Sequence, residues 1–308
     1  SAICRLHRSM VQEIARRLLG EGFTLSELSP EASSRRYFRV HGKQLLIVSC
    51  NQGPAIACQE ILTSCNIYSP TYGNHTDGGY LIEDCCDIHL SHAPTSDNYR
   101  MLIEDWHKFS RCALAADHPN YDLALDADLF KRELKQFVDS YLIGFKKLAF
   151  SDMDLQHIND LCAALARDAS FGPQCLQHRD FHCRNIMLHD KYPRPTWIDF
   201  QDMRRGPIFY DLASLYTDAY LDLNDEVFGM IIDAVEDLGD EHEMHAEDVH
   251  PQFQVTALQR VLKALGTFGL LLNNGRGDYA DAERRASICA IALLDHLPDY
   301  YDLRKYLC

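Results

Sequence analysis

Basic residues are scarce in this sequence. Its 308 residues include 30 Lys and Arg against 45 Asp and Glu, which gives a formal net charge of −15 at pH 7. Such a balance is unsuited to nucleic-acid phosphates or anionic membranes, so neither is expected as a partner. Long apolar runs are also missing, since no segment approaches the ~18 residues of a membrane span. The N-terminus lacks the basic-then-apolar form of a signal peptide, and we expect a cytoplasmic protein.

Paired cysteine motifs are absent as well. The chain has 12 cysteines, but none form a C-x-x-C pair or a spacing typical of a disulfide framework. Cys50, Cys162 and Cys289 lie in apolar surroundings, where a thiol packs as a small core residue. We therefore expect reduced thiols.

Apolar periodicity predicts a chain of both strands and helices. Strand-like runs occur at 36–40, 45–48 and 78–84. Apolar residues spaced three and four apart predict helices at 9–19, 102–113, 130–142, 154–167, 211–223, 226–238 and 258–272. A polar stretch at 86–97 is the expected boundary between two lobes, 1–86 and 87–308. The His- and acid-rich segment 241–250 matches no tight metal-ligand spacing, and we expect a connecting loop there.

The stretch 175–213, CLQHRDFHCRNIMLHDKYPRPTWIDFQDMRRGPIFYDLA, carries the strongest chemical signal. Its apolar runs predict a hairpin with a proline-containing turn. Asp180 and Asn185 precede this hairpin, and Asp199 lies at the end of its second strand. Two carboxylates and an amide brought together supply hard oxygen ligands for a divalent cation, and phosphoryl transfer needs the same set. H-x-D or I-D-F alone is usually an ordinary loop or strand end, but the combination is hard to reach by accident.

The chain resembles the aminoglycoside phosphotransferase-like branch of the protein-kinase superfamily. The likeness lies in HRDFHCRNIM, IDFQD and GPIFYDLASL, continues through LQRVLKALGTFGLL, and is strongest to bacterial kinases of N-acetylmuramate and N-acetylglucosamine. It implies an α+β, protein-kinase-like bilobal fold with a small antiparallel-sheet N-terminal lobe and a larger, mainly helical C-terminal lobe. It also implies transfer of the γ-phosphate of ATP, with Mg²⁺, to the anomeric hydroxyl of an amino sugar. By the same resemblance Asp180 is the catalytic base, Asn185 and Asp199 hold Mg²⁺, and His178 and Asp211 brace the loop.

The resemblance also implies a nucleotide site between the lobes. The expected contacts are Ser33, Ser34 and Arg35 at the phosphates, and Ile82, Glu83 and Cys85 around the adenine. Glu83 and Cys85 would act through their main-chain groups. Two features of the family are missing, namely glycines in the segment 29–34 and a lysine in 45–49.

Residues that contact the acceptor are expected next to the motif. The expected contacts are His182, Gln201, Asp202 and Arg204. A sugar needs carboxylate and amide partners for its hydroxyls, while the lactyl carboxylate of muramate needs a cation such as Arg204, Arg260 or Lys263. Each of these residues is as consistent with an ion pair on the surface as with a contact to the acceptor.

Two other functions stay open. An antibiotic-modifying aminoglycoside kinase would need an acid-lined acceptor pocket. A nucleotide-binding pseudokinase is favoured by the missing glycines and lysine, although a binding module has no need of Asp180, Asn185 and Asp199 together. For a kinase we expect a small-molecule partner and a monomer.

Overall fold

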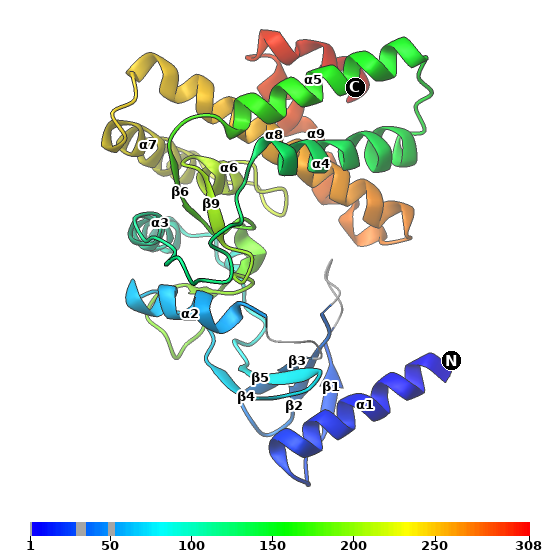
Figure 1. The fold of residues 1–308 in the computed structure, drawn as a ribbon, viewed down its shortest axis with the longest axis vertical. Coiled ribbons are helices and arrows are strands. Elements are labelled where there is room, and N and C mark those ends of the chain that lie inside the picture. The colour runs from blue at the N-terminus through cyan, green and yellow to red at the C-terminus, as the bar shows by residue number, and fades with distance from the viewer. Residues whose placement is uncertain (1, 29–34, 49–52) are drawn as a thin grey trace.

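The computed structural model describes residues 2–28, 35–48 and 53–308, and its N-terminal part is built on a small sheet (Figure 1). Helix α1 (Ala2–Leu19) precedes five antiparallel strands in the order β1-β2-β3-β5-β4. The strands are β1 (Leu25–Glu27), β2 (Tyr37–Val40), β3 (Leu45–Val48), β4 (Tyr72–Thr76) and β5 (Gly79–Glu83). The three strand-like runs predicted from the sequence are therefore confirmed.

The two faces of this sheet have different roles. One face packs under α1 through the buried residues Phe38, Val40, Ile47 and Leu81. The other face carries Val48, Tyr80 and Ile82. Tyr72 lies beside that second face, and its ring meets Phe200 of the motif stretch edge-on, with ring centroids 6.2 Å apart. The second face is therefore the one turned toward the motif.

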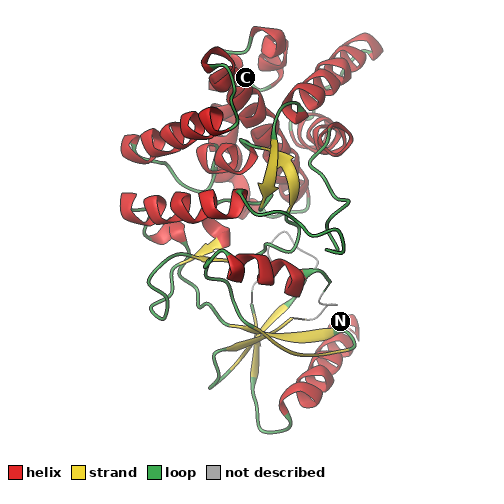
Figure 2. Ribbon diagram, turned by 60° about the vertical axis from the view of Figure 1, so that its left-hand side comes forward, coloured by secondary structure: helices red, strands yellow, loops and turns green. Residues whose placement is uncertain are grey.

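The remainder of the chain is mainly helical (Figure 2). Its α-helices are α2 (Ala55–Ser64), α3 (Ser96–Ser110), α4 (Ala127–Gln136), α5 (Asp152–Ser170), α6 (Tyr210–Tyr216), α7 (Asp225–Glu241), α8 (Ala246–Asn273) and α9 (Ala280–Leu294). Shorter helical segments are η1 (Leu90–His92), η2 (Phe137–Phe145), η3 (Cys183–Asn185), η4 (Gly277–Tyr279) and η5 (Pro298–Tyr306). Two small sheets pair β6 (Gln174–Gln177) with β9 (Arg204–Pro207), and β7 (Ile186–Met187) with β8 (Thr196–Trp197). A small antiparallel sheet beside a helical bundle confirms the predicted bilobal fold.

Helix α8 is the central helix of this bundle. The apolar stripe predicted for 258–272 is buried, including Leu258, Val261 and Leu265. Its length and apolarity would suffice for a membrane span, but 61% of the apolar window is buried inside the protein. This burial is what a core helix requires, because helices pack around α8 from several sides (Figure 1).

Several element boundaries differ from the sequence-based expectations. The helix expected at 211–223 ends at Tyr216, because the Asp218 side chain turns inward and accepts hydrogen bonds from the backbone N–H of Cys183 and Tyr220. The loop expected at 241–250 is shorter, since α8 already begins at Ala246. The helix expected at 130–142 changes from α to π geometry at Phe137.

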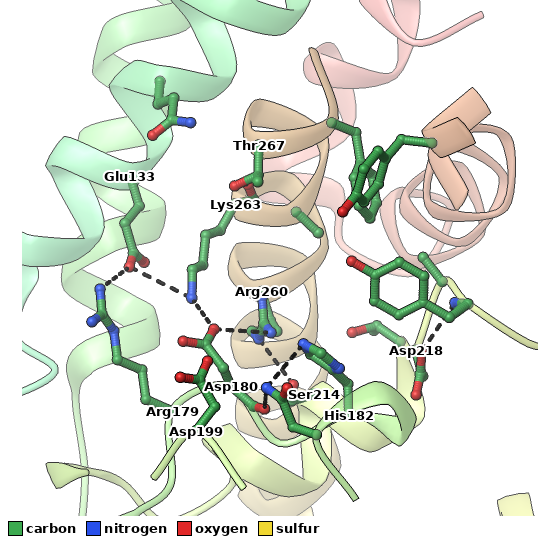
Figure 3. Close-up of a pocket in the computed structure, with 18 residues that line it drawn as sticks. Glu133, Arg179, Asp180, His182, Asp199, Ser214, Asp218, Arg260, Lys263 and Thr267 are labelled. Atoms are coloured by element: carbon green, nitrogen blue, oxygen red, sulfur yellow. Dashed lines mark hydrogen bonds and ion pairs between the residues drawn. The ribbon is translucent and has the colours of Figure 1, made fainter. Parts of the chain in front are cut away.

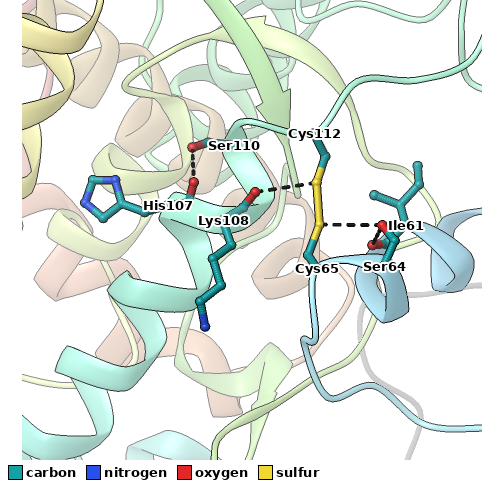
Figure 4. Close-up of a disulfide and its surroundings, with 7 residues drawn as sticks. All are labelled: Ile61, Ser64, Cys65, His107, Lys108, Ser110 and Cys112. Carbon is teal, nitrogen blue, oxygen red and sulfur yellow. Dashed lines mark hydrogen bonds between the residues drawn. A yellow bond between two sulfur atoms is a disulfide. The ribbon is translucent and has the colours of Figure 1, made fainter.

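The expectation of reduced thiols is wrong for one pair. Cys65 at the end of α2 and Cys112 just after α3 form a disulfide (Figure 4). The two cysteines are 47 residues apart, so no local spacing signals the pairing. The fold brings the C-terminal ends of the two helices together. Cys58, Cys162 and Cys183 are free and buried, as core thiols would be. Cys50 lies outside the described residues.

Candidate active site

Asp211, at the start of α6, binds the backbone of the loop that leads to Asp180. Its buried carboxylate accepts hydrogen bonds from the backbone N–H of His178 at 2.6 Å and of Arg179 at 3.0 Å. Trp106 Nε1 also donates to it, at 3.2 Å. The ring of His178 contacts the main-chain oxygen of Ile198 at 3.0 Å. Asp211 and His178 thus bind main-chain atoms of the motif stretch, and their role as braces of the loop stays a prediction that these contacts support.

Asp180, Asn185 and Asp199 line one cavity of about 370 Å³ (Figure 3). The side-chain amide of Asn185 donates to the main-chain oxygen of Asp180 at 2.8 Å, and its own main-chain oxygen accepts from Ile198 N–H at 3.0 Å. Arg179 and Asp199 have φ angles of 84° and 60°. A left-handed backbone is unfavourable for residues other than glycine, and such conformations cluster at functional sites. The backbone at Arg179 and Asp199 therefore has an energetically unfavourable conformation, and this conformation orients their side chains.

Two cations from α8 control the charge of Asp180. Lys263 Nζ lies 2.9 Å from Asp180 Oδ1, and Arg260 Nη2 lies 3.6 Å from the same oxygen. Burial acts to raise the pKa of Asp180, but Lys263, Arg260 and Arg179 outweigh it and hold the pKa well below its ordinary value. Asp180 is therefore ionised at neutral pH.

Asp199 is held by two donors. Its Oδ1 accepts from Arg35 Nη1 at 3.0 Å and from Gln201 Nε2 at 2.9 Å. Burial raises its pKa, with Gln201 acting in the opposite direction. The residues present suit Mg²⁺, because the donors are a carboxylate and an amide oxygen, both hard ligands. The amide of Asn185 fits this use, since its nitrogen is engaged by Asp180 and its oxygen is left to accept or ligate.

The residues expected to contact the nucleotide fall into three groups. Ser33 and Ser34 are outside the described residues. Arg35 reaches Asp199 from the sheet side. Ile82, Glu83 and Cys85 run along and just beyond β5, and all three are buried. The Glu83 carboxylate is bound by Lys191 and by Tyr192 Oη at 2.9 Å, so its side chain links the end of β5 to the turn after β7.

Of the four residues expected at the acceptor, one lines the cavity. His182 does so, and its ring lies 3.4 Å from the Asn185 amide nitrogen. Burial and Arg260 lower its pKa to about 3, so the ring is neutral. Gln201 instead holds Asp199, and Asp202 pairs with Arg204 and Arg179 at 3.5 Å. Gln201, Asp202 and Arg204 do not line the cavity.

Sequence reasoning missed much of the cavity wall. Missed lining residues include Glu133, Gln136, Tyr220, Phe268 and Tyr279. They come from α4, the segment after α6, α8 and η4, which the tertiary fold alone brings together. Arg260 and Lys263, which the sequence offers only as cations for the lactyl carboxylate of muramate, do line the cavity. Glu133 gave no comparable signal among the charged residues around it.

The fold and this site define a phosphotransferase of the kinase-like type. Residues 79–246 match the model of the phosphotransferase enzyme family, and the protein belongs to that family. Two curated relatives are named N-acetylmuramate/N-acetylglucosamine kinase. The one from Pseudomonas putida is 28% identical over 274 residues, covering 83% of this chain and 79% of the relative. The one from Pseudomonas aeruginosa is 29% identical over 206 residues, covering 63% and 59%.

A solved structure supports the fold. The ADP-bound aminoglycoside phosphotransferase APH(2'')-Ib is similar with a TM-score of 0.58 and 15% identity, covering 92% of this chain and 96% of that one. The protein is thus an enzyme of the kinase class, as expected from the motif, and its relatives act on small molecules.

Proposed function

We propose that this enzyme transfers the γ-phosphate of ATP to the anomeric hydroxyl of N-acetylmuramate or N-acetylglucosamine. The proposal rests on one observation above all, the convergence of Asp180, Asn185 and Asp199 on a single cavity. A reaction of this kind needs positioning and charge stabilisation more than covalent chemistry. We propose that the enzyme acts in the cytoplasm, as a monomer.

Asp180 orients the acceptor hydroxyl and receives its proton late in the transfer. A carboxylate whose pKa is held well below its ordinary value is a weak base. An anomeric hydroxyl is more acidic than an ordinary alcohol, so it suits such a base. Asn185 and Asp199 would hold Mg²⁺, which when bound neutralises charge on the β- and γ-phosphates.

Arg35 supplies a cation on the nucleotide side of the site. Strand β3 reads Leu-Leu-Ile-Val and has no lysine. Arg35 comes just before β2, the strand next to β3, and its guanidinium lies 3.0 Å from Asp199. A guanidinium there is well placed for the phosphates that share Mg²⁺ with Asp199. The adenine would lie against the face that carries Ile82.

The cavity favours a small neutral or anionic acceptor. Its volume of about 370 Å³ is at the small end of the roughly 300–1,000 Å³ of ligand sites. Two of the acids that line it, Glu133 and Asp180, pair with Lys263, which lowers the negative charge that a cationic aminoglycoside would meet. Three curated relatives carry the amino-sugar name.

An acceptor panel tests the proposal. The enzyme and Mg-ATP are incubated separately with N-acetylmuramate, N-acetylglucosamine, kanamycin and choline, and the acceptor is analysed by mass spectrometry. We expect one added phosphoryl group on the two amino sugars and none on the others. Phosphorylation of kanamycin alone would assign the antibiotic-modifying function, and no transfer to any acceptor would favour the pseudokinase.

A further inference from the structure

Helix α8 directs two cations at one oxygen of Asp180 (Figure 3). Arg260 and Lys263 are three residues apart, so they share a face of the helix. Both approach Oδ1, Lys263 at 2.9 Å and Arg260 at 3.6 Å. Among residues 2–28, 35–48 and 53–308, no side chain hydrogen-bonds to Oδ2 of Asp180. That oxygen belongs to a residue that lines the cavity, so it is left for a ligand.

Lys263 is itself fixed by its neighbours. Its side chain is 13% exposed, and its ammonium also meets Tyr210 Oη at 3.5 Å and Glu133 Oε1 at 3.8 Å. Arg260 is fixed in turn by Ser214 Oγ at 3.0 Å and lies over the Tyr210 ring. A buried ammonium with three partners has one preferred position, so it can hold a carboxylate in one orientation.

The catalytic loop supplies no equivalent grip of its own. Arg179, next to Asp180 in sequence, directs its guanidinium to Glu133 and Asp202, each at 3.5 Å. His182, two residues after Asp180, directs its ring to Asn185. The orientation of Asp180 therefore depends on α8, whose Lys263 is 83 residues away from Asp180 in sequence.

We propose that Lys263 is a positioning residue for phosphoryl transfer, which grips Oδ1 of Asp180 so that Oδ2 meets the acceptor hydroxyl. Arg260 reinforces this grip on the same oxygen. The inference rests on the proposed function of the site. It differs from a role for Lys263 in binding an acidic group of the acceptor, because a positioning residue acts on every acceptor alike.

Two acceptors that differ by one carboxylate separate these roles. N-acetylmuramate carries a lactyl carboxylate that N-acetylglucosamine lacks. For Lys263→Met we expect kcat to fall by the same factor with both sugars, about 10²-fold as for a misplaced catalytic group. The acceptor KM and the Kd of Mg-ATP should stay within about twofold. Lys263→Arg should recover part of kcat, and Lys135→Met, an exposed lysine of α4, should behave as wild type.

Other outcomes overturn the proposal. A loss confined to N-acetylmuramate and carried by KM would make Lys263 a carboxylate-binding residue. An unchanged kcat would remove it from the machinery. If Lys263→Met fails to fold, Lys263→Ala with added methylammonium replaces it, and recovery of kcat by the amine is the expected result, while no recovery counts against the role. If wild type uses neither sugar, the proposed function fails, and Lys263 is judged by the same kcat comparison on the acceptor that the panel reveals.

Discussion

Asp180 is the proposed catalytic base. We expect Asp180→Asn to retain the fold and Mg-ATP binding but to lower kcat by about 10²–10⁴-fold, because the amide cannot accept a proton. Steady-state kinetics and nucleotide titration measure the two effects. Asp190→Asn, an exposed carboxylate in the turn after β7, is the matched control. Near-normal turnover of the Asp180 variant would remove Asp180 from the catalytic role.

At the scale of residues, the sequence predicts site residues that lie within one short stretch and misses contacts between distant segments. The spacing of Asp180, Asn185 and Asp199 is a property of one short stretch, so their joint presence could be inferred and their convergence expected. The ion pair of Lys263 with Asp180 and the wall made by Glu133 depend on how α4 and α8 pack. No pattern within either helix specifies its partner. Ser33 and Ser34 remain predictions at the phosphates.

At the scale of elements, α8 must pass close to η2. A Cβ placed on Gly266 would lie 2.7 Å from Phe137 N, a backbone atom that cannot move aside alone. We expect Gly266→Ala to destabilise the protein by about 1–3 kcal/mol through overpacking. Gly229 of α7 has no neighbour within 4 Å of such a Cβ, so Gly229→Ala should instead stabilise it by about 0.5–1 kcal/mol. Urea unfolding measures both, and equal effects of the two substitutions would contradict this packing.

The end of β5 contains a pH-sensitive link. Burial acts to raise the pKa of Glu83, but hydrogen bonds from Lys191, Thr71 and Tyr192 outweigh it and lower the pKa. The unfolded chain then binds the proton more tightly, so the link stabilises the fold above the unfolded pKa of about 4.3 and is lost as pH falls through the folded value. We expect Glu83→Gln to lower Tm at pH 7, and the difference to shrink below about pH 4. A Tm difference that stays constant with pH would contradict the link.

Element boundaries show where periodicity fails. The α6 helix ends early because Asp218 caps the backbone of η3 and its own turn, a contact between segments 35 residues apart. The π geometry of η2 likewise has no counterpart in the apolar spacing of 130–142. Long apolar stripes such as 258–272 were predicted correctly, since burial of one stripe depends little on which element covers it.

For the whole molecule, the Cys65–Cys112 disulfide ties α2 to the end of α3. We expect thiol titration of the denatured protein with Ellman's reagent to find two fewer reactive cysteines before reduction than after it. Closing a segment of this length restricts the unfolded chain, so Cys65→Ser should cost about 3–4 kcal/mol under oxidising conditions. The same substitution should have little effect in reductant. An equal thiol count before and after reduction would show both cysteines as free.

The small sheet and the helical bundle contribute residues to the site from opposite sides. Arg35 enters the site from the sheet side, and Asp180 and Lys263 from the helical side, so the nucleotide and the acceptor would meet between them. This arrangement was predictable through the resemblance of the chain to a family, which the motif stretch 175–213 and the segment 258–271 carry. Composition and charge alone argued only against nucleic acids and anionic membranes as partners.

The most direct measurement is the bonding of phosphorus in the product. Wild-type enzyme, Mg-ATP and N-acetylmuramate are incubated together, and the product is examined by ³¹P–¹H correlation NMR. The account predicts a phosphorus nucleus coupled to the anomeric proton, with loss of the sugar's reducing end. A phosphorus coupled to a different ring position, or release of inorganic phosphate without a phosphorylated sugar, would contradict it.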